Sequence, residues 1–264
     1  MKIGFIGCGN MATAMLKGIL KSGEVKNADM IASAKSDKTR EKIEKELGIQ
    51  KADTNAQVVD FADVVFLAVK PQFLEEVLDE IKDNVKEGQI FISIAPGKTL
   101  QWLGEHLGEG TKIIRTMPNT PAMVGEGMTA LCVNEQVTEQ ETLLAVTLCN
   151  TFGKTEVIPE HLMDAVVGVS GSSPAYVFMF LEAMADAAVA DGMPRAQAYK
   201  FAAQAVLGSA KLMLETGKHP GELKDMVCSP AGTTIDAVRV LEECGFRGTI
   251  IDAVQTCVEK SRSL

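Results

Sequence analysis

The alternation of short apolar runs with helical patterns over residues 1–158 limits the possible folds of this chain more than any other feature. The runs are KIGFI, MIAS, DVVFLAV, QIFISI and KIIRT, and the helical patterns cover 10–22, 37–47, 72–83 and 99–107. The runs are nearly all apolar, as strands covered on both faces require. Their order and spacing predict an α/β domain with a parallel sheet and helices on both faces.

From residue 159 onward the strand signal disappears and consecutive helical patterns follow. In 195–215 polar residues recur every three to four positions and leave only one narrow polar stripe. The stretch 175–190 is also mostly apolar, so these helices carry more apolar surface than a unit of this size buries alone. We therefore predict an all-α oligomerisation domain at 159–264, through which two copies of the chain form a homodimer.

Charge and aromatic content exclude one class of partner. Acidic residues outnumber basic residues by 35 to 26, the formal net charge is −9, and the chain has 10 Phe, 2 Tyr and 1 Trp. Nucleic-acid binding usually depends on a basic face or on stacking aromatic side chains. A small-molecule substrate is therefore expected, and nucleic acid is not expected as a partner.

Apolar runs and cysteine spacing bear on location and metal content. Glu182 and Asp186 interrupt the stretch 174–190, so no apolar run reaches the roughly 18 residues of a membrane helix. The chain opens directly on a strand pattern, which leaves no room for a signal peptide. Six cysteines without a CxxC pair and three separated histidines favour neither a metal site nor a disulfide framework. We predict a cytoplasmic protein that is not bound to a membrane.

The stretch GFIGCGNMATAM places Gly7, Gly9 and Ala12 in a GxGxxA pattern directly after the first strand run. In this context Gly7 allows a tight turn, Gly9 lets the backbone approach a pyrophosphate, and Ala12 lets the helix pack closely. The free N–H groups at the start of the helix would face the phosphates. The pattern predicts a Rossmann-like dinucleotide-binding domain over 1–158.

The end of the second strand run indicates which dinucleotide is bound. An NAD site normally has Asp or Glu there, but Ser33 lies near the end of this run and Asp29 precedes it. Ser33 and Lys35, with Lys38 or Arg40 as further candidates, are suited to binding a 2′-phosphate. Lys38 and Arg40 could equally form a solvated helix start. NADPH is therefore the predicted cofactor, with NADH as the alternative.

Four further stretches carry motifs that agree with one known family. They are AVKPQ (68–72), RTMPNTPAMVGEGMTAL (115–131), GVSGSSPAY (168–176) and HPGELKDMVCSPAGTTIDAVRVLE (219–242). With them, essentially the whole chain resembles pyrroline-5-carboxylate reductase. The resemblance implies an NAD(P)H-dependent reduction of 1-pyrroline-5-carboxylate to L-proline, the last step of proline biosynthesis. It also implies a helical C-terminal domain that interlocks with a second subunit, in dimers that often assemble into decamers.

The same resemblance implies a set of site residues. The substrate would lie against Ser229, Gly232, Thr233 and Thr234. The segment 95–97 would border the nicotinamide. The cofactor-binding residues would be Ile6, Gly7, Cys8, Gly9, Asn10, Met11, Ser33, Lys35, Asn55, Ala68, Val69, Lys70, Pro71, Ala95, Pro96, Gly97 and Cys228.

Some residues in or near these motifs have plainer explanations. Lys70 could simply end its strand, because it precedes a proline. The segment 117–121 could be only a rigid turn. Glu182 and Asp186 more often mark a solvated or ion-paired helix face than an acid–base pair. His219, just before a proline, is more often a residue that begins a helix than a proton donor.

The stretch 227–238 offers no lysine, histidine or carboxylate before Asp236. Ketone reduction needs a proton donor beside the forming alkoxide, whereas an iminium accepts hydride and becomes a neutral amine. A site for a protonated cyclic imine therefore has to position its substrate rather than titrate. Backbone N–H groups at the helix start would hold the substrate carboxylate, and Thr234, the predicted catalytic residue, would hydrogen-bond the ring nitrogen. Thr233 and Thr234 could instead act only as helix caps.

Two other functions fit part of the pattern. A β-hydroxyacid dehydrogenase shares the layout of a Rossmann-like domain followed by helices, but SGSSPAYVFMF has no lysine where that family has a catalytic one. A non-catalytic NADPH-sensing protein would not need the motif at 228–234. Reduction of a cyclic imine is the favoured prediction.

Overall fold

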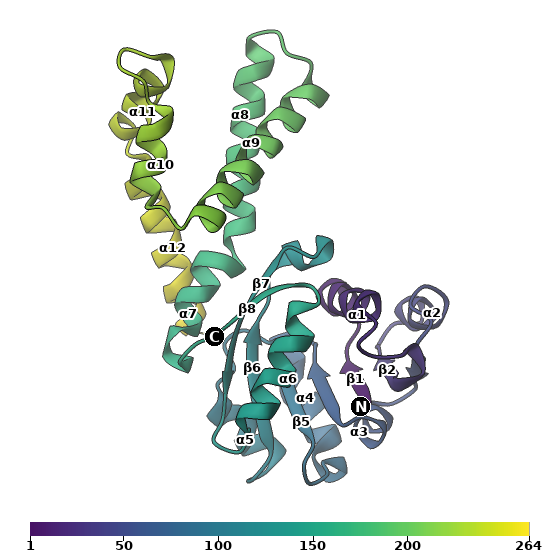
Figure 1. The fold of residues 1–264 in the computed structure, drawn as a ribbon. Coiled ribbons are helices and arrows are strands. Elements are labelled where there is room, and N and C mark those ends of the chain that lie inside the picture. Colours follow the sequence, from purple (N-terminus) through teal and green to yellow (C-terminus); the bar gives the residue numbers. More distant parts are fainter. Residues whose placement is uncertain (264) are drawn as a thin grey trace. The chain divides into compact units, whose positions relative to one another are not determined.

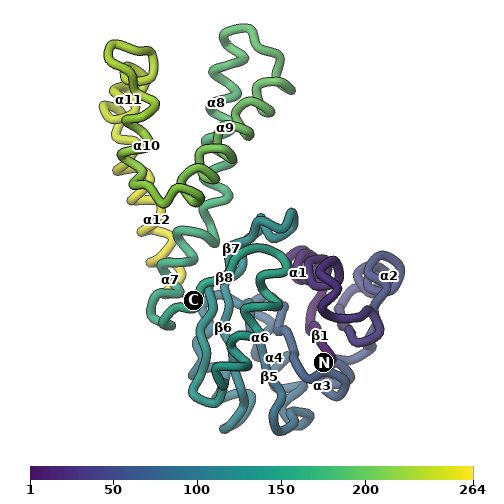
Figure 2. The backbone as a smooth tube through the Cα atoms, in the orientation of Figure 1, coloured from purple at the N-terminus to yellow at the C-terminus, as the bar shows by residue number. Residues whose placement is uncertain are grey.

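The structure is a computed structural model that describes residues 1–263, and these residues form two compact units. Residues 1–172, together with the chain from Cys257 onward, form what we call the sheet unit. Residues Ser173–Thr256 form the helical unit. The order of the elements can be followed by colour along the chain in Figures 1 and 2.

The division between the units differs from the predicted domain boundary at residue 158. Helix α7 (Met163–Val166), whose first residue is fully buried, belongs to the sheet unit, as does the π-helical turn Val167–Gly171. The end of the chain also returns to this unit, where the hydroxyl of Ser261 donates to a carboxylate oxygen of Asp164 (2.7 Å). The helical unit is thus an insertion into the sheet unit.

The sheet unit is built on one sheet with the strand order β3-β2-β1-β4-β5-β6-β7-β8. Strands β1 to β6 are parallel, so the predicted Rossmann-like α/β fold is confirmed. The strands are β1 (Ile3–Ile6), β2 (Met30–Ser33), β3 (Gln50–Ala52), β4 (Val64–Leu67), β5 (Ile90–Ser93), β6 (Lys112–Met117), β7 (Gly127–Val133) and β8 (Gly153–Val157).

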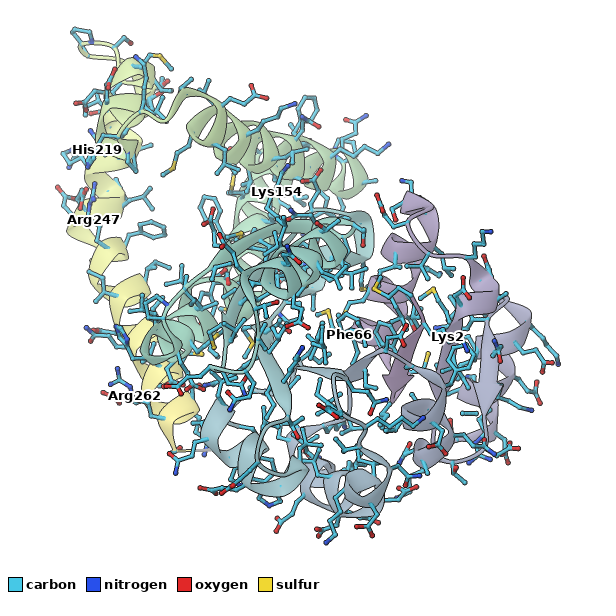
Figure 3. The ribbon with its side chains drawn as sticks, turned by 60° about the horizontal axis from the view of Figure 1, so that its bottom comes forward. Lys2, Phe66, Lys154, His219, Arg247 and Arg262 are labelled. Atoms are coloured by element: carbon cyan, nitrogen blue, oxygen red, sulfur yellow. The ribbon has the colours of Figure 1, made fainter. Side chains whose placement is uncertain are left out.

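Helices cover both faces of the sheet, because successive strand residues point to opposite sides. One core cluster contains Phe5 and Phe66, whose rings stack with centroids 4.5 Å apart, and it packs against α1, α2 and α6. Phe66 is labelled in Figure 3. The other cluster contains Val65 and Phe91 and packs against α3, α4 and α5. These helices are α1 (Asn10–Ser22), α2 (Asp37–Lys45), α3 (Asn55–Phe61), α4 (Pro71–Ile81), α5 (Leu100–Leu107) and α6 (Glu139–Asn150).

Capping residues explain where most of these helices begin. The side chains of Ser36, Thr54, Thr99 and Thr138 accept hydrogen bonds from backbone N–H groups in the first turns of α2, α3, α5 and α6. Pro71 occupies the first position of α4, where its missing N–H costs nothing. Helix α1 differs, because no side chain among residues 1–263 caps it. Its first N–H groups therefore stay available to another acceptor.

Strand β7 departs from the predicted all-parallel sheet, because it pairs antiparallel with β6. The 3-10 helix Thr120–Val124 joins the two strands. This connection is too short for the crossover of a dozen or more residues that a parallel pair needs. Strand β8 follows α6 and pairs parallel with β7, which completes the sheet.

The helical unit is a succession of helices, as predicted. Helices α8 and α9 pack along each other as an antiparallel pair (Figure 1). The rings of Phe180 on α8 and Phe246 on α12 lie with centroids 6.3 Å apart. The helices are α8 (Ser173–Ala190), α9 (Arg195–Thr216), α10 (Pro220–Val227), α11 (Thr233–Glu243) and α12 (Phe246–Arg262), the last of which ends in the sheet unit.

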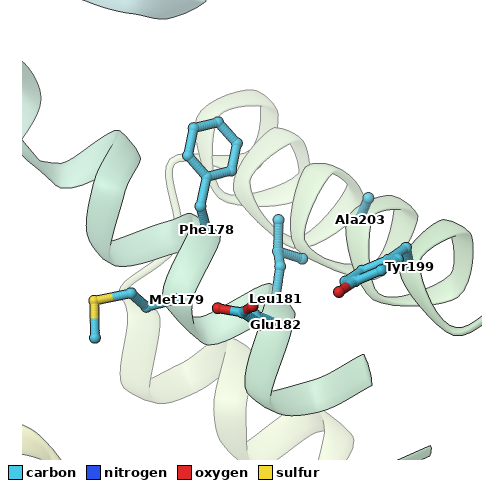
Figure 4. A pocket seen from close by; sticks show the side chains of 6 residues that line it. All are labelled: Phe178, Met179, Leu181, Glu182, Tyr199 and Ala203. Atoms are coloured by element: carbon cyan, nitrogen blue, oxygen red, sulfur yellow. The ribbon is translucent and has the colours of Figure 1, made fainter. Parts of the chain in front are cut away.

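Large apolar side chains are exposed along α8 and α9. Phe178 and Met179 are 65% and 70% exposed on α8, and Phe201 and Leu214 are 67% and 84% exposed on α9. An open groove lies beside Phe178 and Met179, as Figure 4 shows. Its lining residues are Phe178, Met179, Leu181, Glu182, Tyr199 and Ala203. Monomeric soluble proteins rarely expose a continuous apolar surface of this kind.

One helical stretch, 160–190, has the length and composition to cross a membrane, with a mean hydropathy of 1.2. It was not predicted from the sequence, because Glu182 and Asp186 interrupt the apolar run. Length and composition do not separate a membrane helix from an apolar helix that a protein partner covers. A single such helix is therefore weak support for a membrane span.

Candidate active site

Gly7 lies where the ends of β1, β2 and β4 meet at the carboxyl edge of the sheet. Its N–H donates to the carbonyl oxygen of Ser33 (3.2 Å) at the end of β2. Its φ is +92°, and a Cβ at this position would come within 2.7 Å of the carbonyl oxygen of Ala68 and 2.9 Å of Cγ1 of Val69. Only glycine fits this turn. The order of the strands reverses between β1 and β4, and open α/β sheets bind ligands at such a point.

The start of α1 has the shape and charge that a dinucleotide pyrophosphate requires. Gly9 is the N-cap residue, and the first turn of the helix contains no acidic side chain. A Cβ at Gly9 would meet no other atom within 4 Å, so the backbone faces open space. The uncapped N–H groups and the helix dipole together favour an anion there. These residues fit the predicted cofactor.

A short chain of hydrogen bonds fixes the predicted ribose end of the site. The buried Ser33 hydroxyl donates to Oδ1 of Asn55 (2.6 Å), and Nδ2 of Asn55 donates to Oε2 of Glu80 (2.7 Å). The structure therefore brings together Ser33 and Asn55, which were both expected in the cofactor site. Glu80 was not expected there, because nothing in the sequence links α4 to a residue 25 positions earlier.

The basic residues that follow β2 are only partly free. Nζ of Lys35 lies 5.3 Å from the ring centroid of Phe73, and Nε of Arg40 donates to the carbonyl oxygen of Ala34 (2.7 Å). The side chain of Arg40 is thus held at the end of β2 and does not extend freely into solvent. Lys70 is exposed and is the N-cap residue of α4, as expected for a residue that ends a strand before a proline.

The loop after β5 reaches the same edge of the sheet. Ala95 is buried, and its N–H donates to the Ser93 hydroxyl (3.3 Å). Gly97 has a φ of +76°, which favours glycine at this turn. Since β5 pairs with β4, the segment 95–97 belongs to the same row of strand ends as Ala68 and Gly7.

Cys8 lies between Gly7 and Gly9 in the sequence, and its thiol is buried. Burial raises its pKa, and the hydrogen bond with Thr13 and the charge of Lys42 only partly oppose this. The thiol therefore stays protonated near neutral pH and is a poor nucleophile.

In the helical unit, 228–234 forms one tight turn that leads into α11. The N–H of Gly232 donates to the carbonyl oxygen of Ser229 (3.0 Å), and a Cβ at Gly232 would overlap the Ser229 hydroxyl. Ala231 has a φ of +55°, the only positive φ of a non-glycine residue among 1–263. Strain of this kind is frequent at ligand sites.

The hydroxyl groups at the start of α11 do not cap that helix. Gly232 is the N-cap residue, and no side chain among residues 1–263 caps the helix, although Thr233 and Thr234 occupy its first two positions. Thr234 is half-buried and Thr233 is exposed. The hydroxyl of Thr234 is therefore available to a ligand, beside the uncapped N–H groups of the helix start.

Other titratable residues in or near the motifs have structural roles. Asp186 forms an ion pair with Arg195, which agrees with an ion-paired helix face. His219 is the N-cap residue of α10, and its Nδ1 accepts the N–H of Gly221 (3.1 Å). Among residues 1–263, no three His, Cys, Asp or Glu side chains gather as they do around a metal ion.

Two family descriptions match the chain. "Pyrroline-5-carboxylate reductase dimerisation" matches residues 160–264, and "NADP oxidoreductase coenzyme F420-dependent" matches residues 2–97. The first match covers the helices of the C-terminal part. The second covers β1 to β5 and the helices between them, with the glycine turn that follows β1.

Whole-chain comparisons agree with the first of these descriptions. A pyrroline-5-carboxylate reductase of Escherichia coli (strain K12) is 54% identical over 263 residues, which is 100% of this chain and 98% of that protein. One from Methanosarcina acetivorans is 44% identical over 263 residues, 100% and 97% of the two chains. The crystal structure of Plasmodium falciparum pyrroline carboxylate reductase with NADP bound superposes with a TM-score of 0.90 at 30% identity, covering 100% and 97%. The chain belongs to the pyrroline-5-carboxylate reductase family.

Proposed function

We propose that this chain reduces 1-pyrroline-5-carboxylate to L-proline, with NADPH preferred over NADH. The observation that carries the proposal is 54% identity along the whole chain to a protein of that name. The uncapped start of α1, with open space beside Gly9, supports the use of a dinucleotide. A β-hydroxyacid substrate is disfavoured by this family membership and by the lack of a lysine in 170–180.

The strand ends of the sheet unit would hold the cofactor. Gly7 to Met11 would bind the pyrophosphate, and Ser33 with Asn55 would bind the adenosine ribose. The segments 68–71 and 95–97 would border the remainder of the molecule. When bound, the reduced dinucleotide supplies the hydride that the imine carbon accepts. The chain's own task is to orient the two reactants and to exclude water.

The turn 228–234 would hold the substrate. The uncapped N–H groups at the start of α11 would donate to its carboxylate, as helix N-termini do for anions. Oγ of Thr234 would accept the N–H of the protonated ring nitrogen and so keep the proton on that atom. Ser229 and Thr233 would line the same site, and Cys228 would lie near the cofactor. No strong acid or base is needed in this step.

The activity is tested by mixing the purified protein with NADPH and 1-pyrroline-5-carboxylate and following the absorbance of the reduced nicotinamide. We expect rapid oxidation of NADPH with proline as the product. In the control with a 3-hydroxy acid and NADP⁺, we expect no reduction of NADP⁺. Activity on the hydroxy acid alone would mean that the fold was predicted correctly and that the proposed substrate is wrong. Tight NADPH binding without turnover on either substrate would favour a non-catalytic sensor.

The same assay measures the cofactor preference. We expect a lower KM for NADPH than for NADH, because Ser33, Lys35 and Arg40 stand where an NAD site carries a carboxylate. Arg40→Glu should raise the KM for NADPH and leave the KM for NADH within about twofold. The reason is that only NADPH carries a 2′-phosphate, whose charge Arg40 would bind. A lower KM for NADH in the natural protein would contradict the preference.

We also propose that the protein works as a cytoplasmic homo-oligomer, without membrane or nucleic acid, in which residues 159–264 form the substrate-binding and dimerisation domain. The family match over 160–264 and the exposed apolar side chains of α8 and α9 support this. Dimers could then assemble into decamers, as the resemblance implies.

Light scattering at micromolar concentration tests the oligomer. We expect a mass of at least twice the chain mass of 28.2 kDa. Phe201→Glu should lower this mass, because it places a charge on the apolar surface of α9, whereas Lys200→Glu on the neighbouring exposed position should not. A monomeric mass for the natural protein would exclude the homodimer, and a tenfold mass would support the decamer.

A further inference from the structure

Asn119 joins two segments of the sheet unit that lie far apart in the sequence. It follows β6 at the carboxyl edge of the sheet and is only 8% exposed. Its Oδ1 accepts the N–H of Met128 on β7 (2.8 Å), and its Nδ2 donates to the carbonyl oxygen of Ser170 (3.0 Å). One buried amide therefore ties the β6–β7 connection to a residue 51 positions later.

Ser170 belongs to the π-helical turn Val167–Gly171, which ends where the chain leaves the sheet unit. In this turn the N–H of Ser172 donates to the carbonyl oxygen of Val167 (2.8 Å), five residues earlier. Such turns are rare, and they occur frequently at functional sites. Asn119 supplies a donor to a carbonyl group within this irregular turn.

The returning chain is fixed at the same place. Oγ of Ser172, the last residue before the helical unit, lies 3.1 Å from Sγ of Cys257, the first residue after it. Both points of connection to the helical unit therefore lie together at one end of the π-helical turn. The hydrogen bond from Asn119 holds that turn to the strand ends of the sheet unit.

We propose that Asn119 is a positioning residue for the reduction, acting through the carbonyl group of Ser170. The proposal rests on the proposed function, in which the cofactor lies at the strand ends and the substrate in the helical unit. Through Ser170, Asn119 holds the backbone of the sheet unit directly before α8, the helix with which the substrate-carrying unit of the proposed function begins. A misplacement of about 1 Å costs on the order of 100-fold in rate. Asn119 itself takes no part in proton or hydride transfer.

The test uses Asn119→Asp in the full-length protein. A carboxylate still accepts the N–H of Met128 but has no donor for the Ser170 carbonyl oxygen, so the substitution removes one bond and keeps the other. Asn134 provides the matched control at the opposite end of β6. Its Oδ1 accepts the N–H of Ile113 (3.1 Å), and its Nδ2 donates to the carbonyl oxygen of Thr111 (2.8 Å).

We expect N119D to lower kcat for 1-pyrroline-5-carboxylate by about 10- to 100-fold, with the Kd for NADPH within about twofold of the natural protein. N134D should lower Tm comparably and leave kcat within about twofold. Amide hydrogen exchange at 167–172 should rise in N119D alone. Equal kcat in N119D and N134D would overturn the proposal and assign Asn119 a purely structural role.

A second variant covers a failure of N119D to fold. Asn119→Gln keeps both amide functions on a side chain one methylene longer, and it should lower kcat more than Asn134→Gln does. Equal losses would again overturn the proposal. An inactive natural protein would instead disprove the proposed function, so the two failures are distinguishable.

Discussion

Replacing Gly9 by valine should raise the KM for NADPH by about 100-fold, which corresponds to about 3 kcal/mol of lost binding. A side chain there would project into open space, because no other atom lies within 4 Å of where its Cβ would stand, and it would occupy the room of the pyrophosphate. The backbone has a φ of −76° and a ψ of −168°, which any residue adopts. Tm should fall by only about 2–4 °C, because valine caps a helix less well than glycine.

Gly7→Val provides the contrast for this prediction. It places a β-branched residue at a φ of +92° and against the carbonyl oxygen of Ala68, so the folded protein itself should be lost. Steady-state kinetics and thermal unfolding separate the two variants. An unchanged KM for NADPH in Gly9→Val would mean that the dinucleotide does not lie at the start of α1.

Thr234→Ala should lower kcat by about 10- to 100-fold, since a hydrogen bond to a charged group contributes about 1.5–3 kcal/mol. The Kd for NADPH, measured by fluorescence titration, should stay within about twofold, because Thr234 lies in the helical unit and the residues proposed to bind the pyrophosphate lie in the sheet unit. Thr234→Ser, which keeps the hydroxyl, should recover most of the activity.

Thr233→Ala is the matched control, because Thr233 is the preceding residue of the same helix start but is exposed where Thr234 is half-buried. It should reduce kcat less than Thr234→Ala does. If Thr234→Ala turned over as fast as the natural protein, Thr234 would have no part in the reduction, and the substrate nitrogen would need another partner.

The sheet could be predicted because its information is local. Each of the five predicted strand runs is nearly all apolar, and each glycine or capping residue acts within a few positions of itself, as at Gly7 and Thr54. Strands β3 and β8 are short and polar and carry no such signal. Strand β7 could not be predicted in this way. Its direction depends on the length of the connection Thr120–Val124, and its partner β6 is set by tertiary packing.

The residues of the site divide in the same manner. The turn at Gly7 and the turn before Thr234, the proposed substrate turn, could be found from short motifs, because each is complete within about ten residues. Glu80 and Asn119 could not, since each acts on a residue far along the chain through one hydrogen bond. For Asn119 the only signal in the sequence was its place between two prolines, which equally fits a rigid turn.

The interrupted course of the sheet unit bears on how the protein is made. A chain leaves the ribosome from its N-terminus, and domains usually fold as they emerge. Here the segment from Cys257 onward, which includes the hydrogen bond from Ser261 to Asp164, is synthesised after the helical unit but belongs to the unit that emerged before it. The sheet unit therefore cannot complete its contacts until this segment has been made, and a premature stop ahead of Cys257 would remove contacts from the part of the fold that was made first.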